Sequence, residues 1–426
     1  MSADPGDSFA AEPYERLGFA PVIVGGDTGA YAAARAFHEA YGVSSFVISK
    51  YQMWMIKHSA IIHHLPVENG TVPEHLAQAL EAEPLQRLRA NGVRILLLGA
   101  IDSTVQAIIA LRESLGEDFV VPYVDQATFD AGTIKDNFAA LAERLGVDQP
   151  VTRVVDFSGR WEEQVPVDLT YPVWAKPADV TAWYWTEFAG KQKVHRVETP
   201  EELEQLLGAV SDAGYTKTFV IQEEVPGDDE NMRILTCYCD QDSRVRFASW
   251  GETVVEDHSP NALGNPSVIL TGKNSEAVDQ AQKILSALGW VGYANFDLKY
   301  DPRDGRTKFF ELNPRLGRSS HYVTGAGNNP AEYYVRDWID GELTSQPGER
   351  VEDQDEVVYT VLPGWLAARY AGEPQRRAHL RRVLRRHGTK NPFFYREDRG
   401  VRRRALLRAA QLSTVRKFFR YYPPVR

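Results

Sequence analysis

Cysteine and long apolar stretches are scarce in this sequence. Its 426 residues include only Cys237 and Cys239, which excludes a framework of several disulfides and favours two structural thiols, neither bridged nor metal-bound. No stretch approaches the ~18 consecutive apolar residues of a transmembrane helix. The first residues show neither the basic nor the apolar region of a signal peptide, and we therefore expect a cytoplasmic protein.

Glycine-rich phosphate-binding motifs are missing as well. The apolar residues 21–24 are followed by Gly-Gly-Asp-Thr-Gly at residues 25–29, which matches neither the dinucleotide-binding fingerprint nor the P-loop. We therefore predict a small carboxylate rather than a nucleotide at this loop. Residues 177–185, after Lys176, contain no glycine run and carry three aromatic residues, so the sequence does not identify a loop that would cover bound phosphates.

Charge is distributed unevenly along the chain. The formal net charge is −10, yet residues 369–426 contain 18 Lys and Arg against 3 acidic residues, which leaves 30 basic and 55 acidic residues in the rest. Arginine pairs alternate with leucines in this tail, a pattern that predicts short amphipathic basic helices. The arginines either pair with the acidic body or bind an anionic partner, such as a membrane surface, a pyrophosphate-bearing substrate or, less favoured, nucleic acid.

The length and the 43% of hydrophobic residues fit two or three domains. In the first 125 residues, apolar runs alternate with helical patterns, which predicts a doubly wound α/β domain. The expected strands are 21–24, 45–48 and 94–98, and the expected helices are 30–41, 74–90 and 104–114.

From about residue 129 the pattern changes to a helix beginning near residue 133, further strands and a helix over 201–213. Lys176 ends the apolar strand 171–176, where a lysine can meet phosphate oxygens as a point charge, although most strand-end lysines are only solvated. Residues 222–229 predict a strand that runs into a Pro-Gly turn. Free backbone groups at such a connector can hydrogen-bond an adenine edge.

A predicted hairpin formed by residues 295–300 and 309–315, with turn residues 301–305 between them, is the most informative motif. Its period of two places large apolar side chains on one face and polar side chains on the other. The apolar set is Phe296, Leu298, Phe310 and Leu312, and the polar set is Asp297, Glu311, Asn313 and Arg315. Two carboxylates, an amide oxygen and a guanidinium on one face favour a magnesium-bound polyphosphate over an exposed lattice of salt bridges.

Taken in order, these segments resemble the ATP-grasp superfamily, and in particular carboxylate-amine ligases of the D-aspartate ligase type. The resemblance rests on residues 26–42, 226–233, 294–305 and 310–320 and extends from about residue 18 to 340. It implies an α/β domain at 1–128 before a two-subdomain ATP-grasp fold of α+β type at 129–345, with subdomains at 129–225 and 226–345. Residues 346–426 are expected to lie outside the resemblance. They are predicted to form a strand at 357–361 and a basic, largely helical extension.

The resemblance also implies roles for individual residues, with ATP and one or two Mg²⁺ as cofactors and Mn²⁺ as a possible substitute. The implied metal ligands are Asp297, Glu311 and Asn313, and the implied catalytic residues are Arg315 and Lys176. ATP would be bound by Lys135, Lys176, Gln222, Glu223, Glu224, Val225 and Arg233. The substrate would be bound by Asp27, Arg318, Ser319 and Ser320.

Two functions remain open at this stage. The first is a ligase that activates an amino acid carboxylate as an acyl phosphate and transfers it to an amine, with D-aspartate and a peptidoglycan precursor as the implied pair. The basic tail could then approach the anionic precursor or the inner membrane face. The alternative is a non-catalytic regulatory ATP-binding module whose tail binds an anionic polymer.

Overall fold

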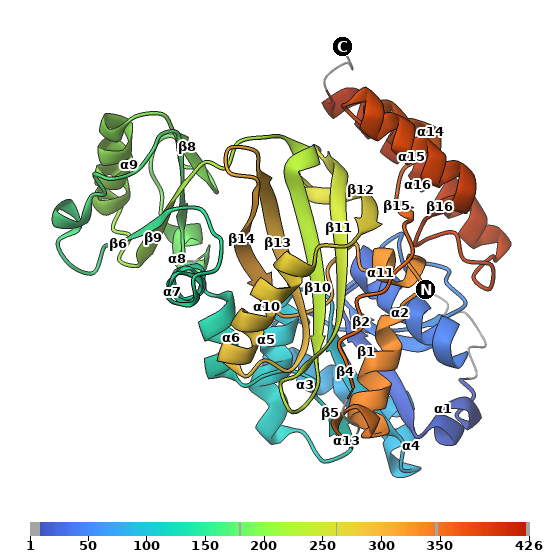
Figure 1. Ribbon diagram of the computed structural model, residues 1–426. Coiled ribbons are helices and arrows are strands. Elements are labelled where there is room, and N and C mark those ends of the chain that lie inside the picture. The colour runs from blue at the N-terminus through green and yellow to red at the C-terminus, as the bar shows by residue number, and fades with distance from the viewer. Residues whose placement is uncertain (1–8, 179, 261, 346–347, 423–426) are drawn as a thin grey trace.

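Three β-sheets organise the chain in the computed structural model, which describes residues 9–178, 180–260, 262–345 and 348–422. Figure 1 shows the second sheet standing apart from the other two, and the C-terminal helices packed beside the edge of the third sheet. The mixed α/β architecture agrees with the fold class predicted from the sequence.

The first sheet is parallel and has the strand order β3-β2-β1-β4-β5. Its strands are β1 (Phe19–Val24), β2 (Ser45–Ser49), β3 (Ile62–Pro66), β4 (Arg94–Gly99) and β5 (Phe119–Val120). The helices around it are α1 (Glu12–Leu17), α2 (Thr28–Tyr41), α3 (Pro73–Leu80), α4 (Glu83–Ala90) and α5 (Asp102–Leu111), and a 3-10 turn, η1 (Arg112–Ser114), follows. The chain crosses from one side of β1 to the other between β3 and β4, so this sheet is doubly wound as predicted.

One prediction in this domain is wrong. Residues 74–90 do not form a single helix, because α3 ends at Leu80 and α4 begins at Glu83, with Pro84 in its first turn. A proline lacks the N–H that a helix interior requires and clashes with the preceding turn, but the first turn of a new helix tolerates it. The strand β3 was not predicted.

The second sheet is antiparallel, with the order β6-β9-β7-β8. It comprises β6 (Thr152–Asp156), β7 (Val173–Pro177), β8 (His195–Val197) and β9 (Thr218–Glu223), with η2 (Trp161–Gln164), α8 (Val180–Trp185) and α9 (Pro200–Asp212). Two helices precede it, α6 (Gln126–Thr133) and α7 (Lys135–Leu145), where the sequence predicted one. The segment after Lys176, expected to be a loop, contains the short helix α8.

The third sheet has the order β14-β13-β10-β11-β12-β15-β16. Its strands are β10 (Met232–Cys239), β11 (Val245–Asp257), β12 (Asn265–Gly272), β13 (Gly292–Asp301), β14 (Arg306–Asn313), β15 (Val358–Thr360) and β16 (Thr389–Lys390). The elements between them are η3 (Asp229–Asn231), α10 (Ser275–Leu288), α11 (His321–Gly325), α12 (Pro330–Tyr334), the π-helix η4 (Val335–Ile339) and α13 (Glu342–Ser345). Cys237 and Cys239 are free, buried thiols on β10, which confirms that they are not bridged.

The hairpin predicted from the sequence is confirmed as β13 and β14, but its apolar face contains one error. The register shifts after Asp297, so that Leu298 lies opposite Phe309 rather than Phe310. Phe309 is buried and packs edge-on against Phe296, whereas Phe310 is only partly buried. A β-bulge adds one residue to one strand and reverses the alternation beyond it, which a strict period of two cannot anticipate.

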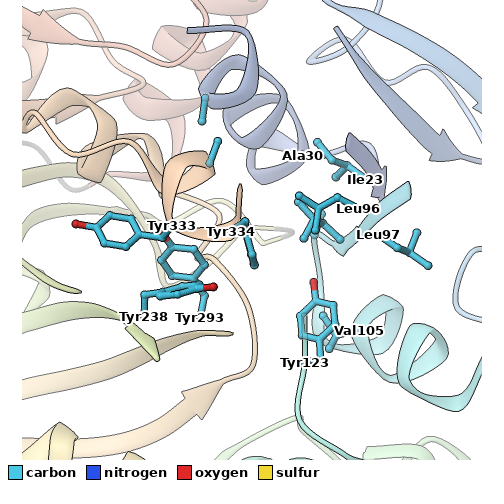
Figure 2. Close-up of a cluster of buried hydrophobic side chains, with 14 of the residues drawn as sticks. Ile23, Ala30, Leu96, Leu97, Val105, Tyr123, Tyr238, Tyr293, Tyr333 and Tyr334 are labelled. Carbon is cyan, nitrogen blue, oxygen red and sulfur yellow. The ribbon is translucent and has the colours of Figure 1, made fainter. Parts of the chain in front are cut away.

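A continuous apolar core joins the first and third sheets. Figure 2 shows Tyr238 and Tyr293 of the third sheet beside Tyr333 and Tyr334 of α12, with Leu96 of β4 on the opposite side of the cluster. The ring centroids of Tyr238 and Tyr293 are 4.7 Å apart, and those of Tyr293 and Tyr334 are 5.0 Å apart. The second sheet has a core of its own.

The C-terminal extension contains α14 (Gly364–Tyr370), α15 (Pro374–His387) and α16 (Val401–Tyr421). Leu366, Leu380, Val383 and Phe418 pack with apolar side chains of β11 and β12 in a separate core. Arg376 pairs with the acidic body, because its guanidinium lies 3.4 Å from Glu252 Oε2 and 3.9 Å from Glu230 Oε2. Within the described residues, every helix is too short or too polar to cross a membrane.

Candidate active site

The polar face of the β13–β14 hairpin brings the three predicted metal ligands together. Asp297 lies directly opposite Glu311 in the strand register. Asn313 Nδ2 donates to Asp297 Oδ2 over 3.1 Å and to the carbonyl oxygen of Asn295 over 3.2 Å. We call Asp297, Glu311 and Asn313 the metal face.

The electrostatics of the metal face fit a divalent cation. Desolvation and the negative charge of Glu311 raise the pKa of Asp297. Desolvation also opposes ionisation of Glu311, but Lys135 and Lys176 outweigh it and lower the pKa of Glu311. The two neighbouring carboxylates repel each other when both are ionised, so one of them tends to keep a proton. Mg²⁺ can replace that proton, because it binds hard oxygen donors such as carboxylates.

The metal face supplies only part of a coordination shell. Nowhere in the described part of the chain do three or more His, Cys, Asp or Glu side chains gather closely enough to hold a metal ion. Two carboxylates and one amide oxygen therefore leave positions for other ligands. This composition fits Mg²⁺, which proteins commonly bind through one or two carboxylates together with phosphate oxygens and water.

Two lysines from the second sheet and its preceding helix face these acids. Lys135 is the first residue of α7, and its Nζ lies 4.0 Å from Glu311 Oε2. Lys176 lies on β7, where desolvation lowers its pKa to about 8 although Glu311 opposes this shift. Because the two cations approach the same carboxylate from separate elements, they surround a space in which phosphate oxygens would find both a metal and fixed positive charge.

Arg315 follows the metal face and is held by a residue that the sequence analysis missed. Its Nη2 donates to Asn313 Oδ1 over 3.1 Å, and its Nε lies 2.9 Å from Asp102 Oδ1. Asp102 begins α5 directly after β4, where the strand order of the first sheet reverses. Functional groups of α/β proteins gather at such reversals, and this position was the one signal in the sequence that pointed to Asp102.

Residues 222–225, at the end of β9, were predicted to bind ATP. Their side chains point to both faces of the second sheet. Gln222 lies opposite Trp174 and Val220 opposite Lys176, so the Gln222 side chain shares a face with Lys176. Glu224 pairs with Arg196, which lies over the Trp174 ring.

Glu223 has a different orientation. Its Oε1 accepts from the backbone N–H of Thr170 over 2.7 Å, and its register partner is the core residue Val173. Only the backbone of Glu223 is therefore available to the Lys176 face. Val225, which follows Glu224, is buried.

Arg233 is not brought to the metal face. It lies opposite Leu298 on β13, and therefore on the face opposite to Asp297. Its guanidinium donates to the carbonyl oxygens of Glu230 and Met232 and lies 5.7 Å from the centroid of the Tyr300 ring. A direct contact between Arg233 and ATP stays a prediction from the resemblance, without support from this geometry.

Three of the four predicted substrate residues line one cavity of about 700 Å³, namely Asp27, Arg318 and Ser319. Asp27 caps α2 by accepting from the backbone N–H of Ala30. A methyl group added at Gly29 would lie 3.4 Å from Arg318 Cα, so the start of α2 closely approaches the loop after β14. The fourth residue, Ser320, is buried next to this lining.

The other walls of this cavity come from distant segments that the sequence analysis did not connect. They include Trp54 in the loop after β2, Asn265 at the start of β12, and Leu407 and Phe418 on α16. Gly25 of the glycine loop lines a different cavity of about 530 Å³, at the carboxyl ends of β1 and β2.

Comparisons with known proteins agree with this geometry. Residues 233–327 match the family model described as carbamoyl-phosphate synthase L chain, ATP binding domain. The chain is 29% identical over 409 residues to the D-aspartate ligase of Enterococcus faecium (strain Aus0004), a match that covers 95% of this chain and 97% of that protein. The similarity therefore continues into the C-terminal extension, which corrects the expectation that it ends near residue 345.

Solved structures share the fold at low sequence identity. One is N5-carboxyaminoimidazole ribonucleotide synthetase from Thermus thermophilus, with a TM-score of 0.55, 16% identity, and coverage of 81% of this chain and 83% of that one. Another is an L-amino acid ligase from Bacillus licheniformis, with a TM-score of 0.51, 17% identity, and coverage of 77% of both chains. At these identities the likeness establishes the common fold alone.

Proposed function

We propose that the chain is an ATP-dependent ligase of the ATP-grasp superfamily, which joins the carboxylate of an amino acid to an amine. ATP with Mg²⁺ or Mn²⁺ is the cofactor set of this superfamily. One observation carries the proposal. Lys135 Nζ lies 4.0 Å from Glu311 Oε2 of the metal face, Lys176 acts electrostatically on the same carboxylate, and Arg315, two residues after β14, donates to Asn313 Oδ1 over 3.1 Å.

The chemistry has two balanced steps. A carboxylate oxygen of the amino acid attacks the γ-phosphorus of ATP, which forms an acyl phosphate and releases ADP. The amine nitrogen then attacks the acyl carbon, the C–O bond to phosphate breaks, and amide, inorganic phosphate and one proton leave. Neither step requires a covalent enzyme intermediate, so the protein contributes mainly positioning and charge neutralisation.

Each group near the metal face has a role in these steps. Asp297, Glu311 and Asn313 would hold Mg²⁺, whose positive charge neutralises the phosphates when it is bound. Lys135 and Lys176 bind phosphate oxygens, and desolvation around Lys176 strengthens its interaction with a bound anion. Arg315, held by Asp102 and Asn313, stabilises the phosphoryl group during transfer.

The substrate residues follow the same reasoning. Arg318 and Ser319 receive the carboxylate substrate, because a guanidinium fork and a hydroxyl donor match carboxylate oxygens. Asp27 can accept from an ammonium group with the oxygen that does not cap α2.

D-aspartate or a related amino acid is the proposed carboxylate substrate, and a peptidoglycan precursor is the proposed acceptor. The similarity to the Enterococcus faecium D-aspartate ligase over nearly the whole of both chains supports this choice. The basic C-terminal helices would favour an anionic precursor or the anionic inner face of a membrane. Arg382, Arg386, Arg404 and Arg408 are all exposed on these helices.

A coupled assay of ADP release over a panel of D- and L-amino acids tests the proposal. Each amino acid is offered with hydroxylamine, which traps the acyl phosphate as a hydroxamate, and with a set of larger amines including a peptidoglycan precursor. We expect Mg²⁺-dependent ADP release and hydroxamate formation with one acidic amino acid, and amide formation with the precursor. Absence of substrate-dependent ADP release under every pairing would contradict a ligase and favour a regulatory ATP-binding module.

A further inference from the structure

The outer face of α16 combines exposed apolar side chains with arginines. Val401, Leu412 and Phe419 have 75%, 72% and 55% of their surfaces exposed. Val401 lies about three turns before Leu412, and Phe419 about two turns after it, so the three side chains form one stripe along the helix. The exposed arginines beside this stripe are Arg402, Arg404, Arg408, Arg416 and Arg420. We call the apolar stripe and these arginines the α16 ridge.

Exposure of the α16 ridge does not result from a detached helix. The opposite side of α16 packs against the body through Leu407, which belongs to the main apolar core, and through Phe418, which belongs to the core beside β11 and β12. The ring centroids of Phe418 and Tyr370 of α14 are 4.9 Å apart. One side of α16 therefore serves the fold. The helix nevertheless carries a second apolar stripe on its solvent side, where a surface helix normally has only polar residues.

The arginines of the α16 ridge are available to an external anion. Arg376 of α15 pairs with acidic side chains of the body. Among the described residues, Arg403 is the one arginine of α16 that forms an ion pair, and its partner Asp398 is buried with it. α16 itself contains seven basic residues and no acidic residue. The acidic body thus neutralises part of the C-terminal extension and leaves the charge of the ridge uncompensated.

The mixture of charge and apolar surface favours a lipid membrane over the other partners that could cover the ridge. A nucleic acid would engage the arginines through its phosphates but would offer little to aliphatic side chains such as Leu412. A second copy of the chain, packed ridge to ridge, would bring two basic helices together, and like charges across an interface repel. Anionic headgroups attract arginines, and the boundary with the acyl chains buries apolar side chains.

The position of the ridge leaves the metal face accessible to substrates. Figure 1 shows the C-terminal helices at the edge of the molecule, with the third sheet between them and the second sheet. The C-terminal extension joins the third sheet at β15 and β16, whereas the metal face lies on β13 and β14 at the other end of the strand order. A planar partner that contacts α16 therefore does not need to cover the space between the second and third sheets.

We propose that the α16 ridge is a docking surface for membranes that contain anionic lipids. Val401, Leu412 and Phe419 enter the boundary between headgroups and acyl chains, and the arginines bind lipid phosphates. Because the other side of α16 stays packed on the protein, the helix lies along the membrane surface. The inference goes beyond the proposed ligase reaction and does not depend on it. It also decides between the two anionic partners, precursor and membrane, that the basic helices would suit.

Co-sedimentation of the full chain with large unilamellar vesicles tests the proposal. One set of vesicles is pure phosphatidylcholine, and the other is an equal mixture of phosphatidylcholine and phosphatidylglycerol. An apolar variant, Leu412→Ser with Phe419→Ser, removes most of the stripe. A charge variant, Arg408→Gln with Arg416→Gln, removes two positive charges and keeps the stripe.

Each variant has a matched control away from α16. Val167→Ser with Tyr184→Ser removes two exposed apolar side chains, which are 97% and 70% exposed, from the region of the second sheet. Arg144→Gln with Lys283→Gln removes two exposed positive charges from α7 and α10. Thermal unfolding verifies that all four variants are folded.

We expect the unmodified protein to bind the mixed vesicles at least tenfold more tightly than pure phosphatidylcholine. Each arginine near an anionic surface contributes about fivefold in affinity, so the charge variant should weaken binding to the mixed vesicles at least tenfold. The apolar variant should weaken it at least tenfold as well, because interfacial binding scales with the apolar area that is buried. Both controls should change it less than twofold.

Failure of the unmodified protein to bind the mixed vesicles, or equal affinities in the ridge variants and their controls, would overturn the docking surface. Binding of single-stranded nucleic acid without binding of vesicles would assign the arginines to an anionic polymer instead. A dimer in sedimentation velocity that the apolar variant abolishes would assign the stripe to a second copy of the chain. The vesicle assay requires no turnover, so absence of ligase activity would leave its outcome unchanged.

Discussion

The metal face and the cavity beside Arg318 are built in different ways. The metal face comes from one hairpin, within the 17 residues from Asp297 to Asn313. This cavity is lined by residues as distant in sequence as Trp54 and Phe418. The contrast suggests that a short segment can carry the phosphate chemistry, while the shape of the cavity depends on long-range packing.

Among the substitutions that test this comparison, removing a metal ligand should have the largest effect on activity. We expect Glu311→Gln to lower Mg²⁺-dependent ADP release on the order of 10⁴-fold, about 5.5 kcal/mol, because a neutral amide holds Mg²⁺ poorly between phosphates. Steady-state ADP release measures the loss, and thermal unfolding verifies that the variant is folded. Asp304→Asn, at the tip of the same hairpin, is the matched control. Turnover within threefold of the unmodified protein would rule out Glu311 as a metal ligand.

Arg403 and Asp398 form a buried clamp that holds α16, one wall of this cavity, against the loop after β2. Arg403 Nε lies 3.2 Å from Asp398 Oδ2, and its guanidinium donates to the carbonyl oxygens of Trp54 and Met55. Breaking the clamp should destabilise this part of the protein. Arg403→Met leaves the Asp398 carboxylate buried without its cation, and we expect a loss of about 4 kcal/mol in unfolding free energy. Denaturant unfolding followed by tryptophan fluorescence reports the change. Arg404→Met, one position along α16 on the exposed surface, should stay within about 0.5 kcal/mol of the unmodified protein. Similar stabilities for the two variants would show that the clamp does not hold the wall.

Arg315, which contacts Asn313 of the metal face and Asp102 at the start of α5, should show an intermediate effect. We expect Arg315→Lys to reduce turnover about 100-fold, about 2.7 kcal/mol, because a lysine cannot contact Asp102, Asn313 and a phosphoryl oxygen in one planar fork. Binding of Mg-ATP, measured separately, should change little. Arg303→Lys in the exposed hairpin turn is the control. A rise in KM for ATP with unchanged kcat would assign Arg315 to ground-state binding instead.

Substitution of Glu256, near the end of β11, should have the smallest effect. This effect is on folding stability, and it depends on pH. Burial, together with the negative charges of Asp229 and Asp297, raises the pKa of Glu256 to about 8, although Lys299 opposes this. Because the folded state holds this proton more tightly than the unfolded state, with its ordinary pKa of 4.5, stability should fall as pH rises from about 4.5 to 8.

Glu256→Gln removes that penalty. The full shift would correspond to roughly 5 kcal/mol, but Glu256 is only half-buried and water screens its charge. We therefore expect the variant to exceed the unmodified protein by about 1–2 kcal/mol at pH 8.5 and to match it near pH 4.5, as measured by thermal unfolding at both values. Glu276→Gln, on the exposed first turn of α10, should match the unmodified protein throughout. A difference that does not vary with pH would exclude titration of Glu256 as its cause.

Local sequence patterns predicted much of the fold. They failed where contacts with other segments of the same chain determine the local structure. The alternation in residues 295–300 correctly placed Phe296 and Leu298 in the core, since side-chain direction along a strand depends on the strand alone. The same rule misplaced Phe310, because a bulge arises from pairing with a second strand. Pro84 divided a predicted helix whose amphipathic pattern continues on both sides of the break.

The same distinction between local patterns and long-range contacts applies to the candidate site. Asp297, Glu311 and Asn313 could be found together because one hairpin carries them all. Asp102 could not be paired with Arg315, since no sequence pattern specifies which helix start meets a given strand end. Arg233 was assigned to ATP from its position in a motif, and the strand register directs its side chain to the other face of the sheet.

The sequence by itself determined the charged hairpin, the alternation that exposes its carboxylates, and the basic character of the C-terminal helices. These properties depend on backbone periodicity and composition, which act over a few residues. Only the tertiary structure decided that Lys135 and Lys176 approach Glu311, and that α16 closes a cavity around Arg318. Contacts of that kind depend on how separate apolar faces pack, and packing between distant segments is specified by the whole chain at once.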